Sequence, residues 1–174
     1  GGGTVSNLIV ENSTFAQTST NKYASGALGG IGHLIGGKIQ KSGVVDCIIG
    51  GLGHPGALLG FADGANVSNS YTNGCRIYAL RGDHGGIFAS CSSTNCSFTN
   101  CIASGELYAQ GNSGGFIGNP ARGGTIKNCA VTGKLEARYN SGGFIGEAST
   151  WDKEVGATTI ENCYTTVLVG LRSD

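Results

Sequence analysis

A glycine-rich phrase that recurs along the chain constrains the fold more than any other feature. The segment from Gly114 to Gly118 reads Gly-Gly-Phe-Ile-Gly and returns unchanged from Gly142 to Gly146, and weaker copies begin at residues 26, 56 and 85. The copies therefore recur every 28 to 30 residues. Self-similarity at such a period is typical of solenoids, in which each unit buries its apolar face only against its neighbours.

A second phrase runs in step with the first and defines the strands. The sequence Ile-Lys-Asn-Cys at Ile126 to Cys129 has counterparts that begin at residues 5, 39, 67, 98 and 160. The apolar residues alternate over short stretches bounded by glycine or polar residues, and no helical stripe is present. We therefore predict an all-β fold, a parallel β-solenoid of about six turns of 28–34 residues with three short strands per turn. Residues 1–25 are predicted to form a partial turn that serves as a cap or linking arm, and residues 26–174 the repeat solenoid of a single domain.

Parallel stacking of the turns predicts columns of equivalent side chains along the solenoid axis. One uniformly apolar column contains Val5, Ile39, Val67, Phe98, Ile126 and Ile160. Three further predicted columns are Leu58, Ile87, Phe116 and Phe144; Ala79, Ala109 and Ala137; and the glycines Gly74, Gly105 and Gly133. The asparagines of the second phrase are expected to form a ladder of side-chain amides, made by Asn69, Asn100, Asn128 and Asn162.

The two phrases together resemble the GLUG-motif repeats of secreted and surface proteins, including a region of some immunoglobulin A proteases and bacterial adhesins. The residues that carry the resemblance are Gly114 to Gly118 with Ile126 to Gly133, and Gly142 to Gly146 with Ile160 to Thr165. The likeness is good from about residue 85 onward. It implies a non-catalytic part of a large secreted chain, with a spacer, display or adhesion role.

The composition excludes several classes of partner. Eleven basic and eleven acidic residues cancel, and only 13% of the chain is charged, so the basic footprint needed for nucleic acid is missing. The sequence contains no run of eighteen apolar residues, so it predicts no membrane-spanning helix. A surface with so few charged residues is expected to stay soluble through hydroxyl and amide groups, through attached glycans, or by being covered in an assembly. Three N-glycosylation acceptors begin at Asn12, Asn66 and Asn95.

The seven cysteines fall mainly in the register of the repeat. Cys-x-x-Cys pairs are absent, so no metal or redox motif is indicated. Stacked cysteines acting as small buried fillers are expected at Cys101, Cys129, Cys163, Cys47 and Cys75. Neighbours such as Cys101 with Cys129, or Cys47 with Cys75, also lie within the spacing that a disulfide requires. Cys91 and Cys96 bracket a polar loop and form the preferred candidate disulfide.

The sequence gives little support for catalysis. His33, His54 and His84 stand in no triad or metal-binding spacing, and they are interpreted as loop residues. The carboxylates are dispersed, with only Glu106 and Glu136 close to one face, whereas polysaccharide-cleaving solenoids need clustered acids. We predict no enzymatic activity, cofactor or metal.

The favoured function is therefore a non-enzymatic extracellular module that acts as a structural or adhesion element, a spacer or a subunit of a surface fibre. The solenoid's open ends predict association with copies of itself, end-on or lateral, or with neighbouring domains of a longer chain. The alternative is a solenoid that binds glycans or a receptor, with Tyr78 and Tyr108 in one column as stacking residues. A polysaccharide-degrading enzyme is the least favoured interpretation.

Overall fold

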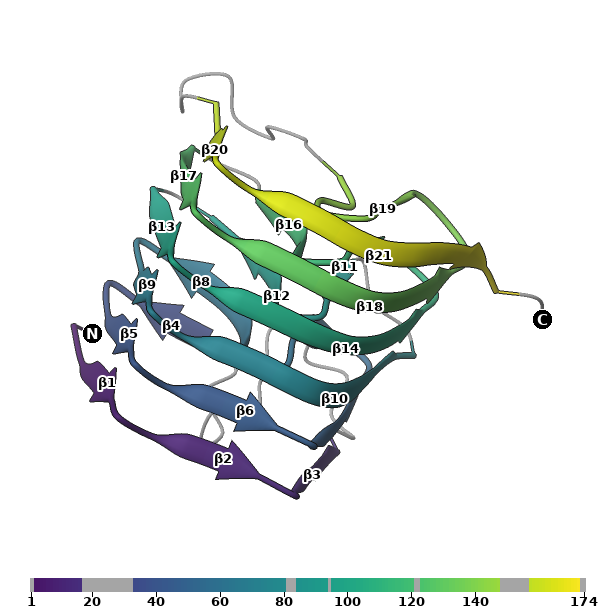
Figure 1. Cartoon of the computed structure of the whole chain (residues 1–174), viewed down its shortest axis with the longest axis horizontal. Helices are drawn as coiled ribbons and strands as arrows, with labels where there is room; N and C mark the ends of the chain where they lie inside the picture. Colours follow the sequence, from purple (N-terminus) through teal and green to yellow (C-terminus); the bar gives the residue numbers. More distant parts are fainter. Residues whose placement is uncertain are drawn as a thin grey trace.

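The chain folds into a parallel β-solenoid without helices in its described part, as predicted. The structure is a computed structural model that describes residues 2–16, 33–80, 84–93, 95–120, 123–147 and 157–172. Every strand pair in it is parallel, and the rungs rise in chain order from β1 to β20 and β21 (Figure 1). Part of the predicted cap or linking arm, Gly1 and residues 17–25, lies outside the described residues.

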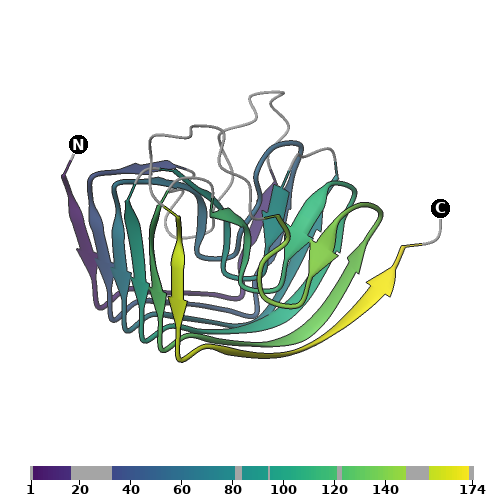
Figure 2. The ribbon, with the colours of Figure 1, turned by 90° about the horizontal axis from the view of Figure 1, so that it is seen from above.

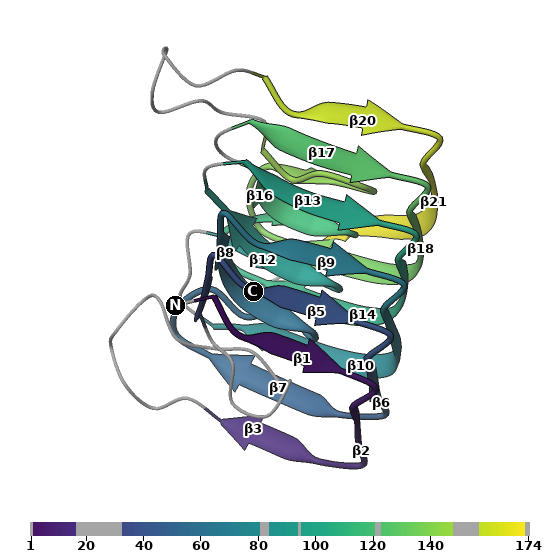
Figure 3. The ribbon, with the colours of Figure 1, turned by 90° about the vertical axis from the view of Figure 1, so that its left-hand side faces the viewer.

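The strands form four sheets, which we call A to D. Sheet A stacks β1 (Thr4–Ser6), β5 (Lys38–Gln40), β9 (Asn66–Ser68), β13 (Cys96–Thr99), β17 (Gly124–Lys127) and β20 (Thr159–Glu161) (Figure 3). Sheet B stacks β2 (Ile9–Glu11), β6 (Gly43–Val45), β10 (Tyr71–Ala79), β14 (Ile102–Ala109), β18 (Ala130–Ala137) and β21 (Tyr164–Leu171), extended in the first two rungs by β3 (Thr14–Ala16) and β7 (Ile48–Gly51).

Sheets C and D complete the coil. Sheet C contains β11 (His84–Gly86), β15 (Asn112–Gly114) and β19 (Ser141–Gly142), and sheet D contains β4 (His33–Ile35), β8 (Leu59–Asp63), β12 (Ala89–Ser92) and β16 (Ile117–Pro120). Seen along the stack, sheet B forms the long base of each rung and sheet A rises from one end of it (Figure 2).

The number of turns and of strands per turn differ from the prediction. Sheet A and the main stack of sheet B each contain six strands, but sheet D contains four and sheet C three. The described residues therefore complete about four turns. Each complete turn contains four strands because the glycine-rich phrase contributes two of them. In the fourth rung, β15 ends at Gly114 and β16 begins at Ile117, with a fold-back between them.

The glycines of this fold-back are required by a close backbone approach. A Cβ atom added at Gly114 would lie 2.0 Å from the carbonyl oxygen of Ile117, and one at Gly86 would lie 1.9 Å from that of Ala89. No side chain fits at such distances, so the chain can reverse here only at glycine. The equivalent contact recurs at Gly56 and Gly142, so it sets the register of the phrase in each described copy.

The predicted columns are confirmed with two corrections. The first column is complete, since Val5, Ile39, Val67, Phe98, Ile126 and Ile160 are consecutive register partners. Ala79, Ala109 and Ala137 also align. In the glycine column, Gly105 aligns with Gly133 but stands on Cys75 rather than Gly74, because a bulge between Thr72 and Cys75 shifts the register.

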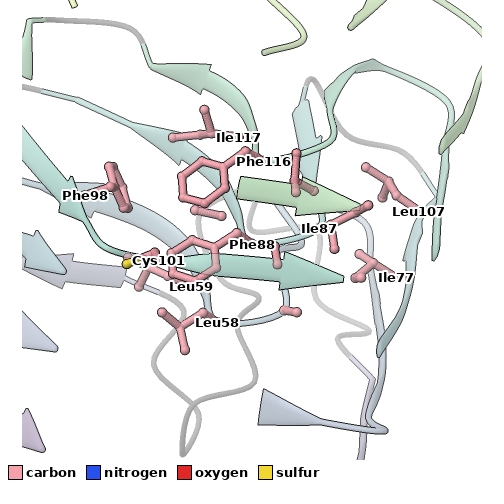
Figure 4. Close-up of a cluster of buried hydrophobic side chains, with 14 of the residues drawn as sticks. Leu58, Leu59, Ile77, Ile87, Phe88, Phe98, Cys101, Leu107, Phe116 and Ile117 are labelled. Carbon is pink, nitrogen blue, oxygen red and sulfur yellow. The ribbon is translucent and has the colours of Figure 1, made fainter. Parts of the chain in front are cut away.

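The second correction concerns the aromatic column, where Phe88 replaces Ile87. Gly86, not Gly85, pairs with Gly114, so Phe88 moves into line with Leu58 and Phe116 (Figure 4). The Phe88 and Phe116 rings stack with centroids 4.7 Å apart, and those of Phe116 and Phe144 are 5.1 Å apart. Ile87 is also fully buried in the core.

The corner after sheet A carries the asparagine ladder. Each amide Nδ2 donates to the Oδ1 of the asparagine one rung below, over 3.3 Å from Asn100 to Asn69, 3.0 Å from Asn128 to Asn100 and 3.3 Å from Asn162 to Asn128. All four residues have φ between 49° and 55°, the left-handed region that asparagine tolerates better than most residues. The ladder is predicted correctly, and it lies on the exposed surface.

Candidate functional site

The outer face of sheet B carries an open groove of about 370 Å³, which is the best candidate site on the described surface. Its floor is bare backbone at the bulge and at the aligned glycines. A Cβ at Gly105 would lie 2.4 Å from the carbonyl oxygen of Cys75, and one at Gly133 would lie 2.0 Å from that of Gly105. Side chains are therefore excluded from the floor, and the walls come from Arg76, Ser104, Glu106 and Lys134.

The charged groups of the groove pair with one another. Arg76 Nε lies 3.5 Å from Glu106 Oε2, and Lys134 Nζ lies 2.5 Å from Glu136 Oε1. The Tyr108 hydroxyl donates to Glu106 Oε2 over 3.0 Å. This hydrogen bond raises the pKa of Tyr108, and the hydrogen bond to Glu136 raises the pKa of Lys134. The groove thus presents balanced charge and several donors and acceptors.

Tyr78 and Tyr108 stack on each other beside this groove. Their ring centroids are 5.3 Å apart and their planes are inclined by 12°. Lys134 Nζ lies 6.0 Å from the Tyr108 ring centroid, on the following rung. Tyr78 therefore covers one face of the Tyr108 ring, and the stacking of a sugar on these tyrosines stays a prediction. The remaining face of Tyr78 points toward Gly50, its register partner on the preceding rung.

The cysteines next to the asparagine ladder occupy a column that serine also fills. Each thiol or hydroxyl in this column donates to the backbone carbonyl two residues earlier. The distances are 2.9 Å for Ser42, 2.8 Å for Ser70, 3.3 Å for Cys101, 3.3 Å for Cys129 and 3.1 Å for Cys163. Cysteine and serine thus perform the same structural task at this corner.

The other repeat cysteines behave in the same way. Cys47 and Cys75 lie on adjacent rungs, and their thiols donate to Val45 O and Asn73 O. Burial raises the pKa of Cys75 to about 11, and a hydrogen bond with Cys129, followed by burial, raises the pKa of Cys101. The structure carries Cys47, Cys75, Cys101, Cys129 and Cys163 as thiols rather than as bridged pairs. Buried, protonated thiols react slowly.

The candidate Cys91–Cys96 disulfide stays a prediction, because the Cys91 side chain lies outside the described residues. Cys96 is buried, and burial raises its pKa. The three glycosylation acceptors Asn12, Asn66 and Asn95 are all exposed.

His54 lies in the loop between β7 and β8, as predicted, whereas His84 begins β11. Both side chains are buried, and their rings stack with centroids 5.6 Å apart. His84 Nδ1 lies 3.9 Å from Glu147 Oε2, an oxygen that also accepts a hydrogen bond from Asn112. The side chain of His33 lies outside the described residues. Among the described residues there is no group of three or more His, Cys, Asp or Glu side chains that would hold a metal ion.

Neither the groove nor the gap at Gly50 was predicted from the sequence. A signal for the groove was present, since Gly74, Gly105 and Gly133 recur near Arg76, Glu106 and Lys134. Those glycines were predicted only as a column. Their effect on the outer surface becomes visible only when the rungs are stacked.

Comparison with known proteins agrees with the repeat register. A family model described as the GLUG motif matches residues 109–136. This stretch runs from the last residue of β14 to the penultimate residue of β18, so the motif spans one full rung. The match is consistent with a GLUG-repeat region. No curated protein and no solved structure matches the chain. The described part contains no helix long and apolar enough to cross a membrane.

Proposed function

We propose that this chain is a non-enzymatic extracellular module that acts as a spacer or fibre subunit and associates through the ends of its solenoid. The supporting observation is that the same columns are buried in the middle and open at both ends. Val5, Val10 and Phe15 are only partly buried in the first rung, whereas their partners Ile39, Val44 and Ile49 are fully buried in the second.

The last rung repeats this pattern at the other end. Phe144 and Ile145 are partly buried, whereas Phe116 and Ile117 below them are fully buried. Leu171 is 87% exposed on β21. The edge strands of both end rungs also have backbone N–H and C=O groups that no further strand pairs with in the described structure. Additional rungs of the same polypeptide or a neighbouring copy would cover the apolar side chains and pair with the edge strands.

The arrangement of carboxylates supports a non-enzymatic role. Glu106 and Glu136 lie on one face, but each already faces a cation, Arg76 and Lys134 respectively. Glycoside hydrolysis needs two carboxyl groups that flank the scissile bond, whereas these two side chains are each engaged in an ion pair.

Two observations support an extracellular setting. The outer face of sheet A presents mainly hydroxyl and amide side chains, among them Ser6, Gln40, Ser68 and Thr99. The buried thiols of high pKa resist oxidation, which suits an oxidising environment without disulfides between the rungs.

Sedimentation velocity at rising protein concentration tests end-on association, together with negative-stain microscopy. We expect the wild-type chain to form linear assemblies that shorten markedly in Leu171→Lys. The matched control is Ile102→Lys, since Ile102 is 60% exposed on the side wall. A chain that stays monomeric at every concentration would contradict the proposal. Assemblies lost in Ile102→Lys but not in Leu171→Lys would show lateral association instead.

A further inference from the structure

The tyrosine ladder on sheet B ends at an empty position. Tyr78 stacks below Tyr108, and its partner on the preceding rung is Gly50, followed by Ala16 on the first rung. No described atom lies within 4 Å of the position that a Gly50 Cβ would take. Because Tyr108 covers one face of the Tyr78 ring, the other face adjoins this gap. Within the described part of the chain, the ladder therefore leaves the second face of Tyr78 beside a position that has no side chain.

The side chains that flank the gap along the strands are apolar. Ile48, which is 42% exposed, precedes Gly50 on the same outer face of β7, and Leu80, which is 46% exposed, comes directly after the end of β10. A ring placed over Gly50 would thus contact an aromatic face and aliphatic side chains. We call this position the Gly50 seat.

The Gly50 seat adjoins the polar groove described above. Arg76 lies two residues before Tyr78 on the same face of β10, and it is also part of the groove wall. The groove adds the hydroxyl of Ser104, the carboxylate of Glu106 and the ammonium of Lys134. These groups supply hydrogen-bond donors and acceptors, and each cation is paired with a carboxylate, Arg76 with Glu106 and Lys134 with Glu136 outside the groove lining.

We propose that the Gly50 seat and the groove together bind a neutral oligosaccharide. One pyranose ring lays its apolar C–H face on Tyr78 above Gly50, and the hydroxyl groups of the following sugars hydrogen-bond to Arg76, Ser104 and Glu106. An aromatic platform next to a few convergent polar groups suits a ligand with one apolar face and many hydroxyls. The balanced charge of the groove disfavours a polyanion. An aromatic side chain of a partner protein would fill the seat but leave the groove unused.

Calorimetric titration of the wild-type chain with defined hexasaccharides tests the inference, which does not depend on end-on association. The neutral probes are β-1,4-linked glucose, mannose and N-acetylglucosamine hexamers and α-1,4-linked glucose hexamer; hexagalacturonate is the charged probe. Gly50→Leu fills the seat and leaves Tyr78 in place, and the open space at Gly50 admits the new side chain. Tyr78→Ala removes the platform. Tyr164→Ala is the matched control, an exposed tyrosine on the last rung.

We expect at least one neutral hexasaccharide to bind, with affinity reduced at least tenfold in both Gly50→Leu and Tyr78→Ala and unchanged in Tyr164→Ala. Circular dichroism of each variant checks that the solenoid is intact. If Gly50→Leu is misfolded, Tyr78→Ala with Arg76→Gln decides the matter. The inference is overturned if no neutral hexasaccharide binds, if Gly50→Leu binds as well as the wild type, or if only hexagalacturonate binds. Binding of N-acetyl-tyrosinamide alone would assign the seat to an aromatic side chain instead.

Discussion

The ring of Phe88 lies parallel to that of Phe116, with the two centroids 4.7 Å apart and the planes inclined by 10°. Phe98 meets both rings edge-on from sheet A, at 6.2 Å and 6.1 Å. Phe88 on the third rung and Phe98 and Phe116 on the fourth thus form one aromatic cluster across two successive rungs. Offset-stacked and edge-on arrangements of this kind add to the energy of apolar burial.

The central ring of the cluster should be the most costly to truncate. Phe116 is fully buried, so Phe116→Ala should lower the free energy of unfolding by about 3 to 5 kcal/mol. Phe116→Leu should lower it by less than about 2 kcal/mol, because Leu58 occupies the same column two rungs below. Urea unfolding followed by circular dichroism measures both. Equal losses in the two variants would contradict this packing.

Two equivalent glycines on adjacent rungs should respond differently to the same substitution. A Cβ at Gly115 would lie 2.0 Å from the carbonyl oxygen of Gly143, whereas a Cβ at Gly143 would meet only the Thr165 side chain at 3.4 Å. Gly115→Ala should therefore destabilise the fold by about 2 kcal/mol or more, and Gly143→Ala by less than about 1 kcal/mol. Thermal unfolding of the pair distinguishes the two outcomes.

The asparagine ladder combines a conformational and a hydrogen-bonding contribution. Asn128 has φ of 53° and bonds to Asn100 and Asn162. Asn128→Ala should lower the free energy of unfolding by about 1 to 2 kcal/mol, because alanine is strained in the left-handed region and the hydrogen bonds of the side-chain amide are lost. Asn128→Gly removes the strain and should cost less than about 1 kcal/mol. If glycine proves as harmful as alanine in chemical denaturation, the backbone conformation is not what selects asparagine here.

Stability should fall in alkaline solution because buried thiols must ionise on unfolding. The pKa of Cys75 is about 11 in the folded chain against 9.0 for an ordinary thiol. Between these values the unfolded thiol has lost its proton and the folded one has kept it, so the free energy of unfolding decreases as pH rises. Over the whole window this amounts to about 2 to 3 kcal/mol. Urea titrations from pH 7 to pH 11 should show a shallower decline in Cys75→Ser than in the wild type, and identical declines would refute this assignment.

Much of the architecture is predictable because one residue pattern is repeated on every rung. The column from Val5 to Ile160 and the alanine column could be assigned from spacing alone, since a parallel stack places like on like. The error at Ile87 arose because Gly85 and Gly86 are both candidates for the fold-back, and Ile87 and Phe88 are both apolar. The contact between Gly86 and the Ala89 carbonyl, which decides the register, cannot be identified from the sequence.

The candidate site was less accessible to sequence reasoning. That Tyr78 and Tyr108 share a column follows from the repeat, but the orientation of their rings does not. Their mutual stacking covers one face of each ring. The bulge at Gly74 and the gap at Gly50 each depend on how one rung lies on the next.

Deletion of one whole rung tests the stacked-repeat account most directly. Removing residues 109–136, the span of the GLUG match, joins Tyr108 to Ala137 and preserves every column, because Tyr108 pairs with Glu136 and Ala109 with Ala137. Removing residues 116–129 deletes part of a rung and breaks the columns. In circular dichroism melts, we expect the whole-rung deletion to retain β structure and cooperative unfolding at a lower temperature, and the partial deletion to be unfolded. If the whole-rung deletion is as unfolded as the partial one, the rungs are not interchangeable stacked units.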